Sequence, residues 1–219
     1  MACYNLFIHS LINWLYIMNI FFTNPNPAVC ATEHCNIHLN KMIVEYAQLL
    51  STAHRLLDGE QYIEITDKGR KIKRWHLPSI NADTILYKAS HVNHPSNRWV
   101  RESSQHYDWL FNTWSCMLDI KREMKGGEDC KAASLKPFLV KHPANIKDNS
   151  FVAPYVAIQP NDHPDIHEML NDDSIDTLGA YRIFMNRKFK NWVTRTDKRK
   201  MYPDWAHSRI PLWVQISIM

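Results

Sequence analysis

Apolar and polar residues repeat with the period of an α-helix in three long stretches of the chain. The first covers residues 27–57, and Asn36, a suitable N-cap, marks a break within it. The second begins at Pro95 and extends to about residue 125, where two glycines end it. The third covers residues 174–193. Three such helices predict a mainly α protein.

Extended segments make up a smaller part of the pattern. Residues 18–23 form a short strand-like run, and residues 60–75 alternate around a turn that contains Gly69, which predicts a β-hairpin. Residues 129–136 favour a short helix, and residues 151–160 favour an extended, partly buried connector. We therefore predict a compact single-domain helical fold with a short N-terminal strand, one small hairpin, and an aromatic tail over residues 200–219 that packs on the core.

The first 17 residues differ from the rest of the chain. They are rich in large apolar residues, carry no Lys or Arg, and lack the features of a signal peptide or a membrane span. We interpret residues 1–17 as an over-extended gene start, with Met18 as the true first residue and 18–219 as the domain. A peripheral amphipathic helix is the alternative.

Composition changes this picture in two ways. Five cysteines without a C-x-x-C pair are typical of a reducing compartment, so we predict the cytoplasm, here that of a host cell, and no membrane association. Residues 182–200 hold eight Lys and Arg against one acid, which predicts a helix that tracks a DNA backbone. The four residues proposed for this contact are Arg182, Arg187, Lys188 and Lys190.

The first helix carries the strongest candidate chemistry. At 100° per residue, His38, Lys41 and Glu45 fall on one side, one turn apart. An amine beside a carboxylate can form a Schiff base and move protons, so these three are the candidate catalytic residues. An ordinary solvated face is the alternative. The order Lys before Glu is the less favourable one for a purely structural pair, which favours the functional interpretation.

A second polar cluster precedes and opens the helix at Pro95. The start of a helix presents N–H groups to an anion, and aromatic rings can stack on an extruded base. We expect this cluster to bind substrate and to line one cleft with Lys41 and Glu45. Its members are Tyr87, His91, Asn93, His94, Arg98, Trp99 and Arg101.

Several chemistries are excluded or left as alternatives. The chain has no GxxxxGK[ST], GxSxG, HExxH or GxGxxG motif, so it is not a P-loop NTPase, an α/β-hydrolase, a common zinc protease or a Rossmann dehydrogenase. We predict no cofactor and no metal. The alternative is a zinc site made from four imidazoles, those of His34, His38, His91 and His94.

Two family resemblances bear on function. The motifs C-x-x-H-x-x-K-M-I-x-E-x-A-Q from Cys35 and N-H-P-x3-W-x-R-E-S from Asn93 resemble a widespread family of small bacteriophage proteins. The spacing of His38 and Glu45 is similar to that of the helical pyrimidine-dimer DNA glycosylases of endonuclease V type. That resemblance implies that Glu45 is the essential carboxylate and His38 a neighbour facing DNA. The Schiff-base amine would be that of Met18 or Lys41.

Together these features predict a phage enzyme acting on DNA, glycosylase-like or base-modifying, with DNA as its partner. One alternative is a non-catalytic module that binds DNA or another partner. Another is an enzyme acting on nucleotides or modified thymines. The sequence predicts neither the base nor the oligomeric state.

Overall fold

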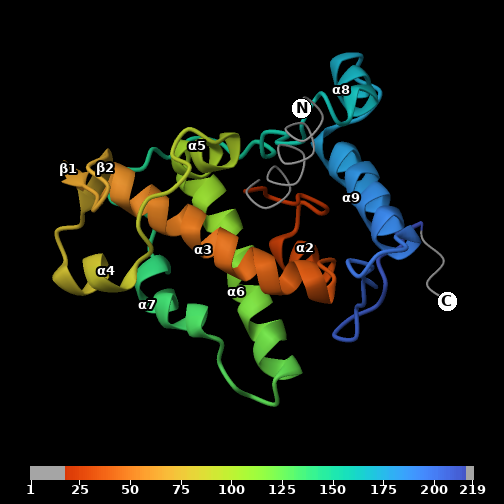
Figure 1. Cartoon of the computed structure of the whole chain (residues 1–219), viewed down its shortest axis with the longest axis horizontal. Helices are drawn as coiled ribbons and strands as arrows, with labels where there is room; N and C mark the ends of the chain where they lie inside the picture. Colours follow the sequence, from red (N-terminus) through yellow and green to blue (C-terminus); the bar gives the residue numbers. More distant parts are fainter. Residues whose placement is uncertain (1–17, 216–219) are drawn as a thin grey trace, which may run out of the picture.

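A computed structural model describes residues 18–215 of the chain, and it is mainly α-helical with one two-stranded antiparallel sheet, as the sequence predicted (Figure 1). The segment assigned to an over-extended start, residues 1–17, lies outside the described residues. No helix between residues 18 and 215 is long and apolar enough to cross a membrane. The helices and strands are α2 (Pro27–Thr32), α3 (Asn36–Asp58), β1 (Glu60–Ile65), β2 (Lys71–His76), α4 (Ile80–Ile85), α5 (Pro95–Glu102), α6 (Ser104–Met124), the 3-10 turn η1 (Lys131–Leu135), α7 (Lys136–Leu139), α8 (Pro164–Asn171) and α9 (Thr177–Thr194).

The core forms where α3 crosses α6. Leu39, Met42 and Leu50 on α3 are fully buried, because they recur with helical spacing on its inner face. Trp114 of α6 is also buried, and its indole N–H donates a 2.8 Å hydrogen bond to the carbonyl of Ile43. This bond satisfies the polar atom of a large ring inside the core and joins the two longest helices.

The helix break near Asn36 is confirmed, although Cys35 and not Asn36 is the N-cap of α3. The predicted second helix is in fact two helices, α5 and α6. Ser103 lies between α5 and α6 in an extended conformation, with φ −152° and ψ 142°. Its hydroxyl accepts a hydrogen bond from the Gln105 N–H and donates one to the carbonyl of Asn149. The cap and the tertiary contact together explain the break, since serine competes for backbone hydrogen bonds at helix ends.

The predicted N-terminal strand is wrong in detail. Residues 18–23 are extended and buried, yet they pair with no strand among the described residues. Side chains satisfy their backbone instead: the Phe21 N–H donates to the hydroxyl of Tyr46, and the Thr23 carbonyl accepts from Arg182. The run threads through the core between α3 and α9.

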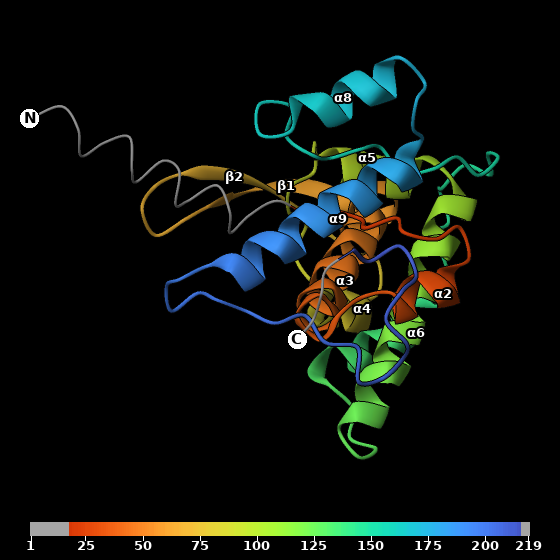
Figure 2. The same cartoon turned by 90° about the vertical axis from the view of Figure 1, so that its right-hand side faces the viewer.

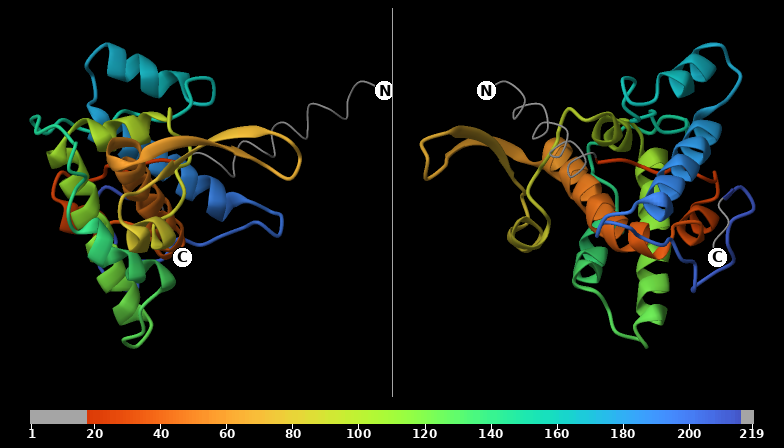
Figure 3. Two further views of the ribbon diagram at one scale, coloured as in Figure 1. Left: turned by 90° about the vertical axis from the view of Figure 1, so that its left-hand side faces the viewer. Right: turned by 45° about the vertical axis from the view of Figure 1, so that its right-hand side comes forward.

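The hairpin is confirmed. Glu60 to Ile65 pairs with Lys71 to His76 in antiparallel register, and Gly69 takes a φ of 72° in the turn. That backbone conformation favours glycine because it has no side chain to clash. The hairpin projects from the body on the same side as the end of α9 (Figures 2 and 3).

The rest of the chain follows the predictions with two additions. The short helix near residue 131 and the extended connector are present, whereas α4 and α8 were not predicted. Helix α9 begins at Thr177 because Asp176 caps it, accepting from the Gly179 N–H. In the tail, Trp205 is buried and donates to the Glu33 carbonyl, while Tyr202 is exposed.

Candidate functional site

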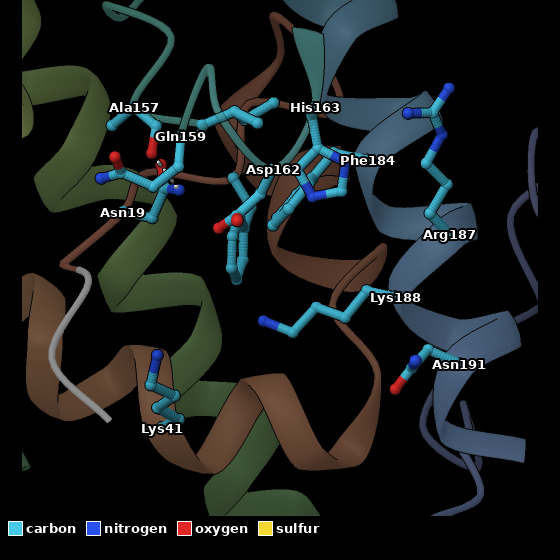
Figure 4. Close-up of a pocket in the computed structure, with 12 residues that line it drawn as sticks. Asn19, Lys41, Ala157, Gln159, Asp162, His163, Phe184, Arg187, Lys188 and Asn191 are labelled. Atoms are coloured by element: carbon cyan, nitrogen blue, oxygen red, sulfur yellow. Dashed lines mark hydrogen bonds between the residues drawn. The ribbon is translucent and has the colours of Figure 1, made fainter. Parts of the chain in front are cut away.

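A cavity of about 360 Å³ lies between α3, α9 and the loop of residues 157–163 (Figure 4). Lys41 reaches it from α3, and Lys188 reaches it from α9. Asn19 and Phe21 of the buried N-terminal segment line it as well. The remaining side chains that line it, from the loop and α9, include Asp162, His163, Phe184, Arg187 and Asn191. Segments that are distant in sequence therefore line one cavity, and they place lysine amines close to aromatic rings.

On the α3 side, Lys41 and Glu45 form the ion pair expected from their spacing. The Lys41 Nζ lies 2.9 Å from Glu45 Oε1, with the lysine side chain 40% exposed and the glutamate side chain 13% exposed. Burial raises the pKa of Glu45, while Lys41 and the Asn19 backbone N–H act in the opposite direction. The second oxygen, Oε2, is buried and has no hydrogen-bond partner among residues 18–215. Glu45 therefore keeps an unused acceptor.

On the α9 side, Lys188 extends into the cavity (Figure 4). Its Nζ lies 5.1 Å from the ring centre of Phe21, 5.7 Å from that of Phe184 and 5.5 Å from that of Trp192. Burial, followed by the charge of Lys41, lowers the pKa of Lys188 to about 8. Lys188 thus lies in the pocket rather than in the phosphate-contacting row predicted for it.

His38 does not line the cavity. Its side chain is 1% exposed and packs against Phe21 and Trp192, with ring-centre distances of 4.8 and 4.9 Å. Burial and then the charge of Lys188 lower its pKa well below the ordinary value, so the ring is neutral. Its Nδ1 lies 3.6 Å from Cys35 Sγ, and its Nε2 has no partner within the described part of the chain. The prediction of a DNA-facing histidine does not fit this position.

The predicted substrate cluster surrounds the start of α5 and does not line this cavity. His94 caps α5 by accepting from the Ser96 N–H. Trp99 is buried and donates to the Val152 carbonyl, while Arg98 lies 4.0 Å from Glu102. Arg101 has a buried Nη1 without a partner in the described residues. The expectation of one cleft shared with Lys41 is therefore wrong for this cavity.

The other members of that cluster have separate positions. The Tyr87 carbonyl accepts from Arg55, and its side chain is half-buried against the core. His91 adopts a left-handed backbone with φ 49°, and its carbonyl accepts from the Asn97 side chain. Asn93 is exposed. These contacts explain the polar motif as loop and cap structure before α5.

The predicted basic row on α9 is divided among different roles. Arg182 donates to the Thr23 carbonyl and lies 5.9 Å over the ring of Trp213. Arg187 forms a two-bond ion pair with Asp165 of α8. Lys190 alone of the four is exposed. Because the other three are engaged in the fold or directed into the cavity, α9 does not present them as one phosphate-binding row.

The four histidines of the metal alternative are not brought together. Both ring nitrogens of His34 are engaged, Nδ1 with the Cys30 carbonyl at 2.7 Å and Nε2 with the Tyr46 hydroxyl at 3.2 Å. Across residues 18–215, no group of three His, Cys, Asp or Glu side chains could hold a metal ion.

Sequence reasoning missed several residues of the cavity. Asn19 belongs to a run whose pattern indicates only an extended segment, and its side chain donates to the Ala157 carbonyl. Asp162 and His163 occupy a loop without periodicity, which gives no signal of what it faces. No family model, curated protein or solved structure matches the chain.

Proposed function

We propose that this protein is a DNA-acting enzyme of glycosylase type that uses a lysine amine as its nucleophile and Glu45 as its proton-transfer group. One observation carries the proposal: two lysine amines, those of Lys41 and Lys188, line a single cavity, and Lys41 is ion-paired with the mostly buried carboxylate of Glu45 behind it. An amine nucleophile and a carboxylate that handles protons are the two groups that Schiff-base cleavage of a glycosidic bond requires.

The carboxylate suits the proton-transfer role because of its environment. Burial favours the neutral acid, so the raised pKa moves Glu45 toward the working range of an acid-base catalyst. Its pairing with Lys41 holds one oxygen in place, and the other is buried without a hydrogen-bond partner among the described residues. Lys41, being 40% exposed, would bind a substrate phosphate at the mouth of the cavity.

A DNA substrate is supported by two basic segments that project from the same side of the molecule (Figures 2 and 3). One is the hairpin, with Lys71 and Lys73 exposed on its second strand. The other is the end of α9 and the residues after it, where Lys190, Lys198 and Lys200 are exposed. Positive charge on two protruding segments favours contact with phosphates of a polyanion.

The test is covalent trapping with borohydride on abasic, uracil-containing and pyrimidine-dimer DNA. We expect a reduced protein–DNA adduct with at least one of these substrates. Glu45→Gln should reduce strand cleavage by about 100-fold, the lower range of a lost acid-base group. Asp119→Asn, at a side chain 64% exposed on α6, is the matched control. Absence of any adduct, with unchanged activity in Glu45→Gln, would refute the proposal.

A second candidate is an enzyme that acts on free nucleotides or modified thymines. The size of the cavity favours it, because about 360 Å³ is in the range of small-molecule sites. Nucleotide binding measured by calorimetry, together with no DNA retention at low salt, would favour this candidate over the first.

A further inference from the structure

We propose that Lys188, rather than Lys41, is the nucleophilic amine of the cavity, and that it forms an imine with the aldehyde carbon of an opened 2-deoxyribose. The inference rests on the proposed function and specifies which atom reacts. It assigns a catalytic role to a residue that the sequence pattern placed on a phosphate-binding surface.

The positions of the two amines differ in the way that matters for nucleophilicity. Lys41 Nζ lies 2.9 Å from the Glu45 carboxylate and its side chain is 40% exposed, so this amine has both a counter-ion and contact with solvent. Lys188 Nζ lies within 6 Å of three aromatic ring centres and forms no ion pair with a carboxylate of residues 18–215. It therefore enters the cavity as the less solvated and less paired of the two.

Every charged group near Lys188 comes from an identifiable element. Lys41 and Glu45 face it from α3, the thiol of Cys35 and the neutral ring of His38 lie at the start of that helix, and Asp162, His163 and Arg187 line the same cavity. The effects of burial and of the Lys41 charge exceed those of Glu45 and Cys35, which favour the ammonium. A second amine beside the nucleophile is an established way to keep the nucleophile neutral.

The protonation state at neutral pH follows from the lowered pKa of Lys188. With a pKa of about 8 in place of 10.5, roughly a quarter of the amine is neutral near pH 7.5, against about one part in a thousand for an ordinary lysine. This difference is more than 100-fold in the concentration of the reactive form. The geometry and the charge state therefore select the same residue.

The reaction balances with the groups present. The lone pair of neutral Lys188 Nζ adds to the aldehyde carbon, forming the N–C bond and moving the C=O π electrons to oxygen. Glu45, as the acid, protonates that oxygen; of the two protons lost from nitrogen, one passes to the same oxygen, which leaves as water, and the other restores the acid form of Glu45, so that a C=N bond results. No oxidant or reductant is required. The rings of Phe21 and Phe184 limit the access of water that would hydrolyse the imine.

The experiment is to trap the unmodified full-length protein on an abasic-site oligonucleotide with cyanoborohydride, digest it, and locate the adduct by peptide mass spectrometry. We expect the adduct on Lys188, with a trapping rate that rises with pH to a midpoint near 8. Because this mapping uses the natural sequence, it does not depend on whether any variant folds.

Variants then separate the outcomes. Lys188→Arg keeps the charge but not the nucleophile and should reduce trapping about 100-fold, whereas Lys125→Arg, at an exposed position at the end of α6 away from the cavity, should leave it unchanged. An adduct on Lys41, with normal trapping by Lys188→Arg, would overturn this inference and leave the proposed function standing, whereas an adduct on an α-amine would overturn the lysine nucleophile of both. No adduct on any residue, with no cleavage of damaged DNA, would overturn both.

Discussion

A cation lies next to the core near each end of α3, and the two cations differ in their hydrogen-bond partners. Near the C-terminal end, Arg55 uses all five of its N–H donors: it bonds the carbonyls of Trp75, Asp83, Leu86 and Tyr87 and the carboxylate of Asp83. Near the N-terminal end, Lys188 has three aromatic rings around it and no hydrogen bond among the described residues.

This difference separates a structural cation from a reactive one. Asp83 accepts from Arg55, from the Leu77 N–H and from His76, and these bonds outweigh burial and lower its pKa to about 2. The Arg55–Asp83 pair therefore stays charged and joins α3 to α4. Lys188 loses hydration without gaining such partners, and its amine is left able to react.

The largest expected effect in this comparison comes from replacing Arg55, the structural cation. Arg55→Leu removes the hydrogen bonds that Arg55 donates to the Asp83 carboxylate and to four carbonyls. We therefore expect the free energy of unfolding to fall by about 3–5 kcal/mol. Urea denaturation measures it. Arg122→Leu, at a side chain 58% exposed on α6, should change stability by less than about 0.5 kcal/mol. A loss below about 1 kcal/mol for Arg55→Leu would mean that the network is not structural.

Acid should destabilise the protein through His34, which is buried just before the N-terminal end of α3. Burial lowers the pKa of His34 to about 4 from 6.5, so the unfolded chain binds the proton more tightly than the folded one between these values. Stability from this group is complete above pH 6.5 and is lost as pH falls toward 4, by up to about 3 kcal/mol.

The measurement is the free energy of unfolding from pH 7.5 to pH 4.5. His34→Asn should reduce the slope of the profile over this range, to which His38 also contributes, whereas Asp83→Asn should not, because the pKa of Asp83 lies near 2. An unchanged slope in His34→Asn would show that another group governs the acid transition.

Replacing Lys188 should cost far less stability than replacing Arg55. Lys188→Met removes a poorly solvated cation without stranding a partner, so we expect stability to change by less than about 1 kcal/mol or to increase. The depressed pKa disfavours the folded state below pH 8, and this penalty disappears as pH rises to 10.5. The gain from Lys188→Met, followed by thermal unfolding, should therefore be larger at pH 7 than at pH 10. A large loss at pH 7 would indicate a hidden partner.

The smallest expected effect is the change in the pKa of Lys188 when a neighbouring charge is removed. Lys41→Gln removes a repelling charge and should raise the pKa of Lys188, whereas Glu45→Gln removes an attracting one and should lower it. The pH dependence of reductive methylation of Lys188, followed by NMR, measures both shifts. Lys121→Gln on α6 is the control, since Lys121 is absent from the cavity. Shifts in the same direction for both variants would contradict the arrangement.

The sequence by itself determined the helices, the hairpin and one local pair. Helical periodicity is a property of neighbouring residues, so α3, α6 and α9 follow from it, and the spacing of four residues alone brings Lys41 to Glu45. The sequence did not predict the helix break at Ser103, because the Ser103 hydroxyl donates a hydrogen bond to a carbonyl 46 residues away.

Only the tertiary structure decided which of these residues share a site. Lys188 is one of eight Lys and Arg residues between positions 182 and 200, and nothing local distinguishes it from Lys190. Packing of α9 against Phe21 and α3 turns one amine toward the cavity and leaves the other in solvent. Similarly, His38 shares a helix face with Lys41 in sequence but is buried by Trp192. Burial depends on contacts between distant segments, and burial is what alters the chemistry of an amine or an imidazole.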